Sequence, residues 1–374
     1  MRHQTLSRAG LAALALVALL AAGCGSDDES GGASAGATPT TKSEGAQTSG
    51  KAGDITTVCG DKPVVVGYLK SAGGNTWVTQ SAAEFMDEAE KCPNIEEAKF
   101  DEAINDQQKA IADINSYVSQ GVDVIVISAD YGAAELPAIR KATQAGVKVV
   151  TILGNAGGKP GEDFVDSVVF DTEYIAQEWA DFINEQLPDG GKVTYLGGTP
   201  GNETSNGFFA GVKKAFEQYP NLELVPDRIN DTNWDPAQKQ KVMTGLLAKH
   251  GRIDAVISDF NGTDAGVIEA YKKAGMEPPV FASITPSNEI GCQWLETPYP
   301  FIVHGETSSM TRLGLRIGMA AAQDLPTEEA SLLRPKAFKY TPDGEQMPCD
   351  KSFPPDADLT ADLTPEQLEE LFSK

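Results

Sequence analysis

Histidine is scarce in this chain, and the motifs of several catalytic classes are missing. Three histidines occur among 374 residues, and neither His250 nor His304 lies in a recognisable triad or metal-ligand spacing. The phosphate-binding pattern GxxxxGK[ST] is absent, and the glycine-rich stretch 197–202 lacks the GxGxxG order. Two strand-end acids that meet would still allow acid–base chemistry. We nevertheless expect a protein that is not an enzyme and that holds no cofactor and no metal.

Basic residues are also few. The chain has 30 Lys and Arg against 54 Asp and Glu, which gives a formal net charge of −24. Nucleic acids and anionic membrane surfaces attract proteins through clustered Lys and Arg. The composition therefore argues against nucleic acid as a partner, and the simplest role of the acidic surface is solubility.

The long apolar run near the N-terminus is too short for a membrane span. Residues 10–23 are almost wholly Ala, Leu, Val and Gly and follow Arg2 and Arg8, whereas a spanning helix needs about 20 apolar residues. A basic start followed by a short apolar core is typical of a secretory signal peptide, here residues 1–23. The stretch 20–24, Leu-Ala-Ala-Gly-Cys, resembles the lipobox of bacterial lipoproteins, which implies a lipid on Cys24, an anchor at the outer face of the cell membrane and an extracytoplasmic location. The alternative is an ordinary cleaved signal in which Cys24 has no role.

Large aliphatic and aromatic side chains are missing from residues 25–53. A segment of Ser, Gly, Ala, Thr and acidic residues buries too little apolar surface to offset its ordering entropy. We therefore expect residues 24–57 to be a flexible linker between the anchor and the folded part.

Cysteine is limited to five residues, of which four remain once Cys24 is set aside. An even number in an oxidising compartment permits two disulfides, in three possible pairings. Cys59 precedes the first predicted strand and Cys92 ends the first predicted helix, whereas Cys292 and Cys349 lie late in the chain. We expect Cys59–Cys92 and Cys292–Cys349, and none of the four has zinc-ligand spacing.

Strand and helix patterns alternate through the rest of the chain. Apolar β-branched runs at 63–69, 122–128 and 147–153 are separated by helical periodicity. The pattern returns with strands predicted at 192–197, 222–228, 254–258 and 279–284. Such runs indicate an α/β fold with parallel sheets covered on both faces. Because the folded part is longer than one hydrophobic core supports, we expect two lobes.

Residues 106–128 and 235–258 repeat one design. Each has an Asp-initiated helix, a Gly stop and an Asp-led apolar strand that ends in Ser. Two lobes built on one plan explain the repeat, and chance similarity between αβ units is the alternative. Ligands of open α/β sheets bind beyond the carboxyl ends of the strands. The loops there carry Asn, Asp, Ser, Thr, Trp and Tyr with few cations, which suits neutral polyhydroxy compounds.

Residues 63–325 resemble the type I periplasmic binding proteins, specifically the ribose-binding-like sugar receptors of ABC importers. The resemblance rests on the order and spacing of residues 71–77, 121–127, 145–150, Trp234-Asp235 and Gly314. It implies two Rossmann-like lobes with parallel sheets, joined by a hinge: an N-terminal lobe of 58–170 plus 306–335 and a C-terminal lobe of 171–305 plus 336–350. A tail of 351–374 follows. Repressors of the lactose type share this core, but they would need a DNA-reading helix-turn-helix where this chain has a signal peptide.

The resemblance also implies a function. Two lobes of a monomer would close on a small sugar, with hinge crossings near 170–172 and 303–306, and the closed form would dock on a membrane permease. A receptor that feeds a sensor kinase or chemoreceptor would have the same fold, site and anchor, and remains the alternative.

Residue by residue, the family's ligand positions fall on Asn75, Trp77, Asp130, Asn155, Asn206, Phe208, Trp234, Asp259, Asn261, Ser283 and Glu306. Trp77 and Trp234 are expected to sandwich the sugar ring. Asn155 stands where ribose receptors have an Asp-Arg pair, Asn206 and Phe208 where they have Arg, Ser283 where they have Asp, and Glu306 where they have Gln. A close ribose site is therefore not expected, while other pentoses, hexoses, sugar alcohols, furanoses and nucleosides stay open.

Each of these positions also has a purely structural explanation. Asn75, Asn155 and Asn206 would serve as turn or helix-cap residues. The tryptophans would be core residues, and the acids would be solvated loop residues.

Overall fold

The computed structural model describes residues 53–71, 73–104, 106–154 and 156–373. The predicted signal peptide, Cys24, residues 24–52 of the predicted linker and Asn155 lie outside the described residues. No helix in the described part is both long and apolar enough to cross a membrane.

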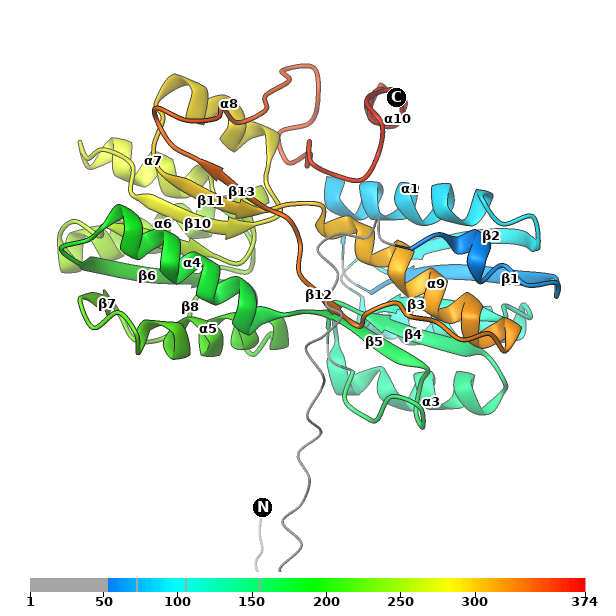
Figure 1. Cartoon of the computed structure of the whole chain (residues 1–374). Coiled ribbons are helices and arrows are strands. Elements are labelled where there is room, and N and C mark those ends of the chain that lie inside the picture. The colour runs from blue at the N-terminus through cyan, green and yellow to red at the C-terminus, as the bar shows by residue number, and fades with distance from the viewer. Residues whose placement is uncertain (1–52, 72, 105, 155, 374) are drawn as a thin grey trace, which may run out of the picture. The chain divides into compact units, whose positions relative to one another are not determined.

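The first lobe is built on a parallel sheet with the strand order β12-β5-β4-β3-β1-β2 (Figure 1). Its strands are β1 (Val64–Lys70), β2 (Ile95–Glu102), β3 (Val124–Ser128), β4 (Lys148–Ile152), β5 (Asp166–Phe170) and β12 (Leu332–Leu333). Every residue of β3 is buried, as expected for a central strand covered on both faces.

Four helices belong to the first lobe: α1 (Thr76–Glu90), α2 (Gln107–Ser119), α3 (Leu136–Gln144) and α9 (Met310–Gln323). The last of these returns from late in the sequence and packs on β3 and β4. A Cβ atom on Gly314 would come within 2.9 Å of Val126, and one on Gly318 within 2.4 Å of Val124. These two glycines therefore let α9 lie close against the sheet.

The second lobe repeats the plan with the strand order β13-β11-β10-β9-β6-β7, and β8 also pairs with β6. Its strands are β6 (Gly191–Gly197), β7 (Leu222–Leu224), β8 (Asn230–Asp231), β9 (Ala255–Ser258), β10 (Val280–Ile284), β11 (Phe301–His304) and the antiparallel β13 (Ala337–Tyr340). Its helices are α4 (Thr172–Gln186), α5 (Glu203–Phe216), α6 (Pro236–His250), α7 (Ala265–Lys273) and α8 (Asn288–Glu296).

The predicted fold class is confirmed: the two lobes each carry a mainly parallel sheet flanked by helices. The two strand-end serines of the repeat have similar partners, although Lys70 ends β1 outside the repeated segment and Lys239 lies on α6 within it. Ser128 ends β3 and accepts a hydrogen bond from Lys70 Nζ (3.1 Å), and Ser258 ends β9 and accepts one from Lys239 Nζ (2.9 Å). Each lysine also pairs with an aspartate, Asp130 in the first lobe and Asp264 in the second.

Within the described residues the chain crosses between the two lobes from β5 to α4, from β11 to α9 and from β12 to β13, and its C-terminal segment crosses once more. The first three crossings are bonded to one another. Arg334 contacts Asp171 at 2.8 Å, the backbone N–H of Asp171 donates to Leu333 (2.9 Å), and that of Gly305 donates to Lys336 (3.0 Å).

The chain ends in a segment that leaves the second lobe after β13 and reaches the first. Its helix α10 (Pro365–Phe372) packs on α1 of the first lobe (Figure 1). The structure contains both expected disulfides, Cys59–Cys92 in the first lobe and Cys292–Cys349 between α8 and this segment.

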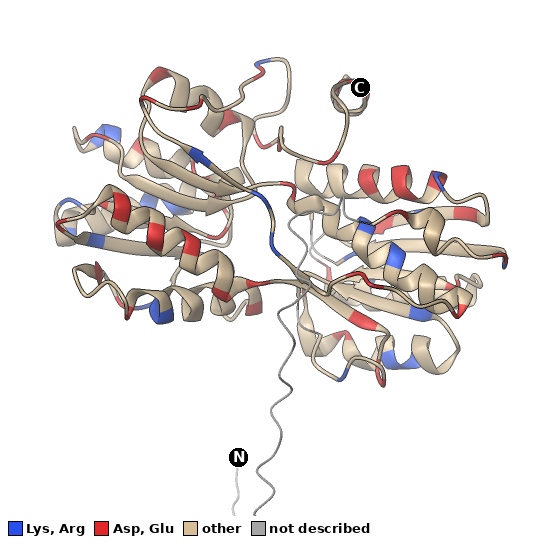
Figure 2. Cartoon of the chain, viewed as in Figure 1, with Lys and Arg blue, Asp and Glu red and all other residues tan. Residues whose placement is uncertain are grey.

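Acidic residues are spread over helices of both lobes, with several on α1 and along α4 (Figure 2). Lys and Arg are fewer, as the composition requires. The cleft described next shows the same excess of carboxylates.

Candidate functional site

A cleft of about 790 Å³ lies at the carboxyl ends of strands from both sheets. Its first-lobe lining comes from the residues after β1, β3, β4 and β5, and its second-lobe lining from those after β6, β8, β9 and β10. Asp356 of the C-terminal segment completes the lining. This is the edge at which open α/β sheets bind ligands, and the volume lies in the range of small-molecule sites.

The first-lobe wall combines an ion pair with an indole ring. Lys70 Nζ lies 2.5 Å from Asp130 Oδ2 and 5.8 Å from the centre of the Trp77 ring. Trp77 is 8% exposed, and its Nε1 donates to Thr307 Oγ1 (2.9 Å), which is itself 2.9 Å from Thr285 Oγ1 of the second lobe. The Trp77 ring is therefore held from two sides before any ligand arrives.

The second-lobe wall centres on the buried carboxylate of Asp259. Trp234 Nε1 donates to its Oδ1 (2.9 Å), while Tyr195 and Ser205 donate to its Oδ2. Burial raises the pKa of Asp259, whereas the hydrogen bonds from Ser205 and Trp234 oppose that rise. A Cβ atom on Gly198 would lie 2.1 Å from the Trp234 ring. Gly198 therefore leaves room for the Trp234 ring, and the Asp259 carboxylate fixes the N–H edge of that ring.

Left-handed backbone conformations gather at the cleft. Leu153, Asn233, Trp234 and Thr285 all line it and all have φ between 52° and 63°. Asn tolerates this region, but for a bulky or β-branched residue it costs of order 1–3 kcal/mol. Such strain persists where the surrounding structure fixes a side chain for a purpose, and here it positions side chains that face a ligand-sized space.

Six of the sequence-predicted site residues come together in the cleft: Asn75, Trp77, Asp130, Phe208, Trp234 and Asp259. Two of them have structural duties as well. Asn75 caps α1 by accepting a hydrogen bond from the N–H of Val78, and Phe208 is fully buried against Trp179.

Four predicted residues lie outside the cleft lining. Asn206 is exposed on α5, and it is Asn202 that caps that helix and lines the cleft. Asn261 is buried and accepts a hydrogen bond from the N–H of Ser287, and Ser283 donates to the carbonyl of Ser258. Glu306 lies in the β11-to-α9 crossing with φ 59°.

The structure adds lining residues that the sequence reasoning missed: Lys70, Tyr131, Asn202, Asn233, Phe260, Thr285 and Asp356. Most adjoin a predicted residue or end a predicted strand, so their position after a strand was the available signal. Asp356 had no such signal, because it follows no strand.

Charge in the cleft is one-sided. Among the described lining residues, Lys70 is the one Lys or Arg, and it stands against Asp130, Asp259 and Asp356. Since Lys70 is already paired with Asp130, an anionic ligand would meet carboxylates without a spare cation. A second cavity, of about 610 Å³, lies between β8 and α6 and contains none of the predicted residues. Within residues 53–373 as described, no group of three or more His, Cys, Asp or Glu could hold a metal ion.

Comparison with known proteins places these features in a family. Residues 66–324 match the family described as "Periplasmic binding protein domain". The D-xylose-binding periplasmic protein of Escherichia coli K12 is 27% identical over 188 residues, which are 48% of this chain and 54% of that protein. The chain spans about half the length of several curated relatives that it matches.

Solved structures agree on the fold. The periplasmic binding component of the arabinose ABC transporter from Shewanella sp. ANA-3, bound to α- and β-L-arabinofuranose, superposes with a TM-score of 0.65 at 20% identity and covers 74% of this chain and 91% of its own. The fructose-binding periplasmic domain of the hybrid two-component system BT1754 superposes with a TM-score of 0.63 at 18% identity, covering 75% and 91%. The matched family is one of binding proteins, in agreement with the expectation of a non-enzyme. The chain therefore belongs to the periplasmic binding proteins of type I.

Proposed function

We propose that the protein captures a neutral sugar or sugar-like polyol in the cleft and delivers it to the permease of an ABC importer. The observation that carries this proposal is the cleft itself, which combines indole rings with many hydrogen-bonding groups and an excess of carboxylates. Sugars need both features, because their hydroxyls seek paired donors and acceptors while their C–H faces stack on aromatic rings.

The lining residues divide these tasks. Trp234 offers a ring that Asp259 binds at its N–H and for which Gly198 leaves room, and Trp77 of the first lobe offers a second ring in the lining of the cleft. Asp130 and Asp356 supply acceptors for hydroxyl groups, and the amide of Asn233 supplies donors. Sugar phosphates and sugar acids are disfavoured, because Lys70 is the one cation among the described lining residues and is already paired.

Anchoring belongs to the same proposal. A lipid on Cys24 with a flexible linker would keep the receptor near its permease, as the lipobox-like stretch 20–24 suggests. That linker is shorter than the predicted 24–57, because Ile55–Thr57 form a short 3-10 helix and Ile55 is buried in the core. Replacement of Cys24 by Ser is expected to release the protein from the membrane fraction. A Cys24→Ser variant that stays in the membrane fraction would contradict the anchor without touching the ligand proposal.

A thermal-shift screen followed by calorimetry tests the ligand proposal. The panel comprises D-xylose, D-ribose, D-fructose, D-galactose, L-arabinose, xylitol and myo-inositol, with D-ribose 5-phosphate as the anionic counterpart. Nucleosides and amino acids are screened beside this panel as other classes of solute. We expect at least one neutral compound to stabilise the protein and the phosphate to have no effect. No stabilisation by any sugar, nucleoside or amino acid would refute the receptor role.

A signalling receptor is the second candidate function, favoured by the likeness to the periplasmic domain of a hybrid two-component system. Ligand capture would be the same, but the closed form would report to a sensor kinase instead of a permease. The neighbouring genes separate the two: a permease and an ATPase indicate transport, and a sensor kinase indicates signalling.

A further inference from the structure

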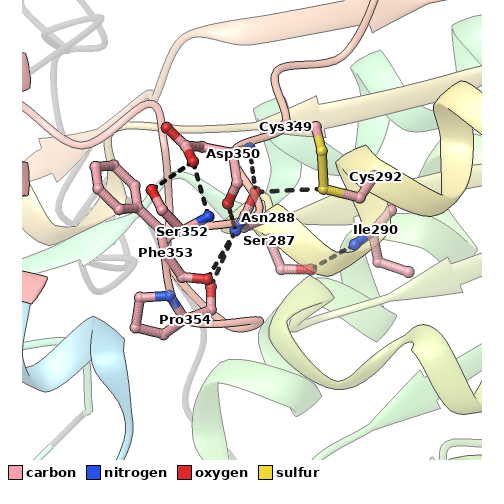
Figure 3. Close-up of a disulfide and its surroundings, with 9 residues drawn as sticks. All are labelled: Ser287, Asn288, Ile290, Cys292, Cys349, Asp350, Ser352, Phe353 and Pro354. Carbon is pink, nitrogen blue, oxygen red and sulfur yellow. Dashed lines mark hydrogen bonds between the residues drawn. A yellow bond between two sulfur atoms is a disulfide. The ribbon is translucent and has the colours of Figure 1, made fainter.

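The segment after Cys349 is bound first to the second lobe, through α8. Asn288 begins that helix, and its side-chain amide donates to the carbonyls of Asp350 (2.6 Å), Phe353 (3.2 Å) and Pro354 (3.2 Å) (Figure 3). Its Oδ1 accepts the N–H of Asp350 (2.8 Å), and the Cys292–Cys349 disulfide lies beside it. One buried asparagine thus fixes the loop backbone of residues 350–354.

Asp356 sits where this segment passes from one lobe to the other. The residues on either side of it accept hydrogen bonds from the start of α8: Glu289 N–H donates to Pro355 (2.7 Å) and Asn288 N–H to Ala357 (2.8 Å). Its side chain reaches the other lobe, where Oδ2 accepts the N–H of Thr76 (3.0 Å) at the start of α1. The carboxylate of Asp356 therefore lies at the cleft between the first turns of two helices, one from each lobe.

The rest of the segment is bound to the first lobe and to the hinge. Gln80 of α1 exchanges two hydrogen bonds with the backbone of Asp358 (2.8 and 3.0 Å). Arg312 of α9 donates to the carbonyl of Asp362 (2.8 Å). Thr360 Oγ1 accepts the N–H of Glu306 (3.2 Å) in the β11-to-α9 crossing. We name residues 350–373 the C-terminal strap, because they are bound to both lobes and to the crossing between them.

We propose that Asp356 is a ligand-contacting residue of the cleft and that the C-terminal strap positions it. The proposal rests on the sugar-binding function proposed above and adds a site residue from outside the alternating sheets. The bond from Thr76 uses one of the roughly four acceptor positions of a carboxylate, so Asp356 has the capacity to accept further hydrogen bonds from ligand hydroxyls. Through the strap, the position of Asp356 at the cleft depends on Asn288, which does not itself line the cleft.

Calorimetry of three variants with the tightest-binding neutral compound of the panel tests this proposal. Asp356→Ala is expected to weaken binding tenfold to a hundredfold, as for a hydrogen bond to a charged group, and Asp356→Asn by less because one acceptor oxygen remains. Asp343→Asn is the matched control: Asp343 is exposed, precedes the strap and lies outside the cleft lining, so its affinity should equal that of the wild type.

Asn288→Ala tests positioning by the strap. It should weaken binding in the wild-type background but have no further effect when residue 356 is already Ala, because the two changes act through one contact. Independent, additive losses would overturn the positioning role. Circular dichroism confirms that each variant is folded, and Asp356→Asn preserves the size of the side chain if Asp356→Ala does not fold.

The outcomes separate this inference from the function on which it rests. A wild-type protein that binds no panel compound, nucleoside or amino acid overturns both. A wild-type protein that binds, with folded Asp356→Ala binding within twofold of it, overturns the role of Asp356 alone.

Discussion

Removal of the Trp234 N–H is the sharpest probe of the second-lobe wall. In Trp234→Phe an aromatic face remains, but the 2.9 Å hydrogen bond to Asp259 is lost. A hydrogen bond to a charged group contributes about 1.5–3 kcal/mol. That bond holds a bulky residue in a left-handed conformation with φ 52°, so its loss frees the ring to leave the cleft. If the whole free energy of this hydrogen bond serves to position the ring, affinity for the tightest-binding sugar of the panel falls about tenfold to a hundredfold.

Trp234→Ala also removes the stacking face. Aromatic contacts contribute about 0.5–1.5 kcal/mol beyond area burial, so a further loss of about twofold to tenfold is expected. Isothermal titration calorimetry measures both variants. Trp294→Phe is the control, because Trp294 is buried in the second lobe away from the cleft and donates to the carbonyl of Tyr299 (2.7 Å). It should lower the melting temperature and leave affinity unchanged. Affinities of both Trp234 variants within twofold of the wild type would refute the reasoning.

Three further predictions concern stability. Burial raises the pKa of Asp358 to about 7, so the folded state binds the carboxyl proton more tightly than the unfolded chain does. The resulting contribution to stability is at most roughly 4 kcal/mol, and it is lost as pH rises from about 4 through 7. The free energy of unfolding of Asp358→Asn, measured in urea, should therefore rise relative to that of the wild type between pH 5 and pH 8. A difference that does not change with pH would contradict this. Arg312 is 3% exposed and pairs with Glu84 and two other carboxylates of α1. Arg312→Ala should therefore lower the free energy of unfolding by about 3–5 kcal/mol in the same assay, because it leaves buried carboxylates unpaired. A loss under 1 kcal/mol would refute a stabilising role for these ion pairs. Replacement of Cys292 and Cys349 by Ser should cost about 4 kcal/mol, since the bridge closes a loop between residues 57 apart in the sequence; an unchanged urea midpoint would count against it.

The sequence allowed the central strands and the fold class to be predicted, because fully buried parallel strands read as continuous apolar runs. Edge elements were harder. A strand was predicted at 222–228, but the structure has β7 at Leu222–Leu224 and β8 at Asn230–Asp231, since Pro226 lacks the N–H that a continued ladder would need. Strand β5 (Asp166–Phe170) begins with two half-buried polar residues and gave no recognisable signal.

The candidate site could be predicted only in part, namely where a residue directly follows a strand. Position after a strand does not fix which way a side chain points, because the alternation ends with the strand and the turn that follows sets its own directions. Asp259 lines the cleft, whereas Asn261, two residues on, begins the short 3-10 helix Asn261–Thr263 and is buried against Ser287. Asp356 could not be predicted at all, because its place depends on contacts with α8 and α1, two helices that lie far away in the sequence.

A crystal structure of the protein grown with its tightest-binding panel sugar tests the central claim most directly. We predict density for one sugar in the cleft, with its ring against Trp234 and a hydroxyl within hydrogen-bond distance of Asp356. A sugar bound elsewhere on the protein, with the cleft occupied by solvent alone, would contradict the account.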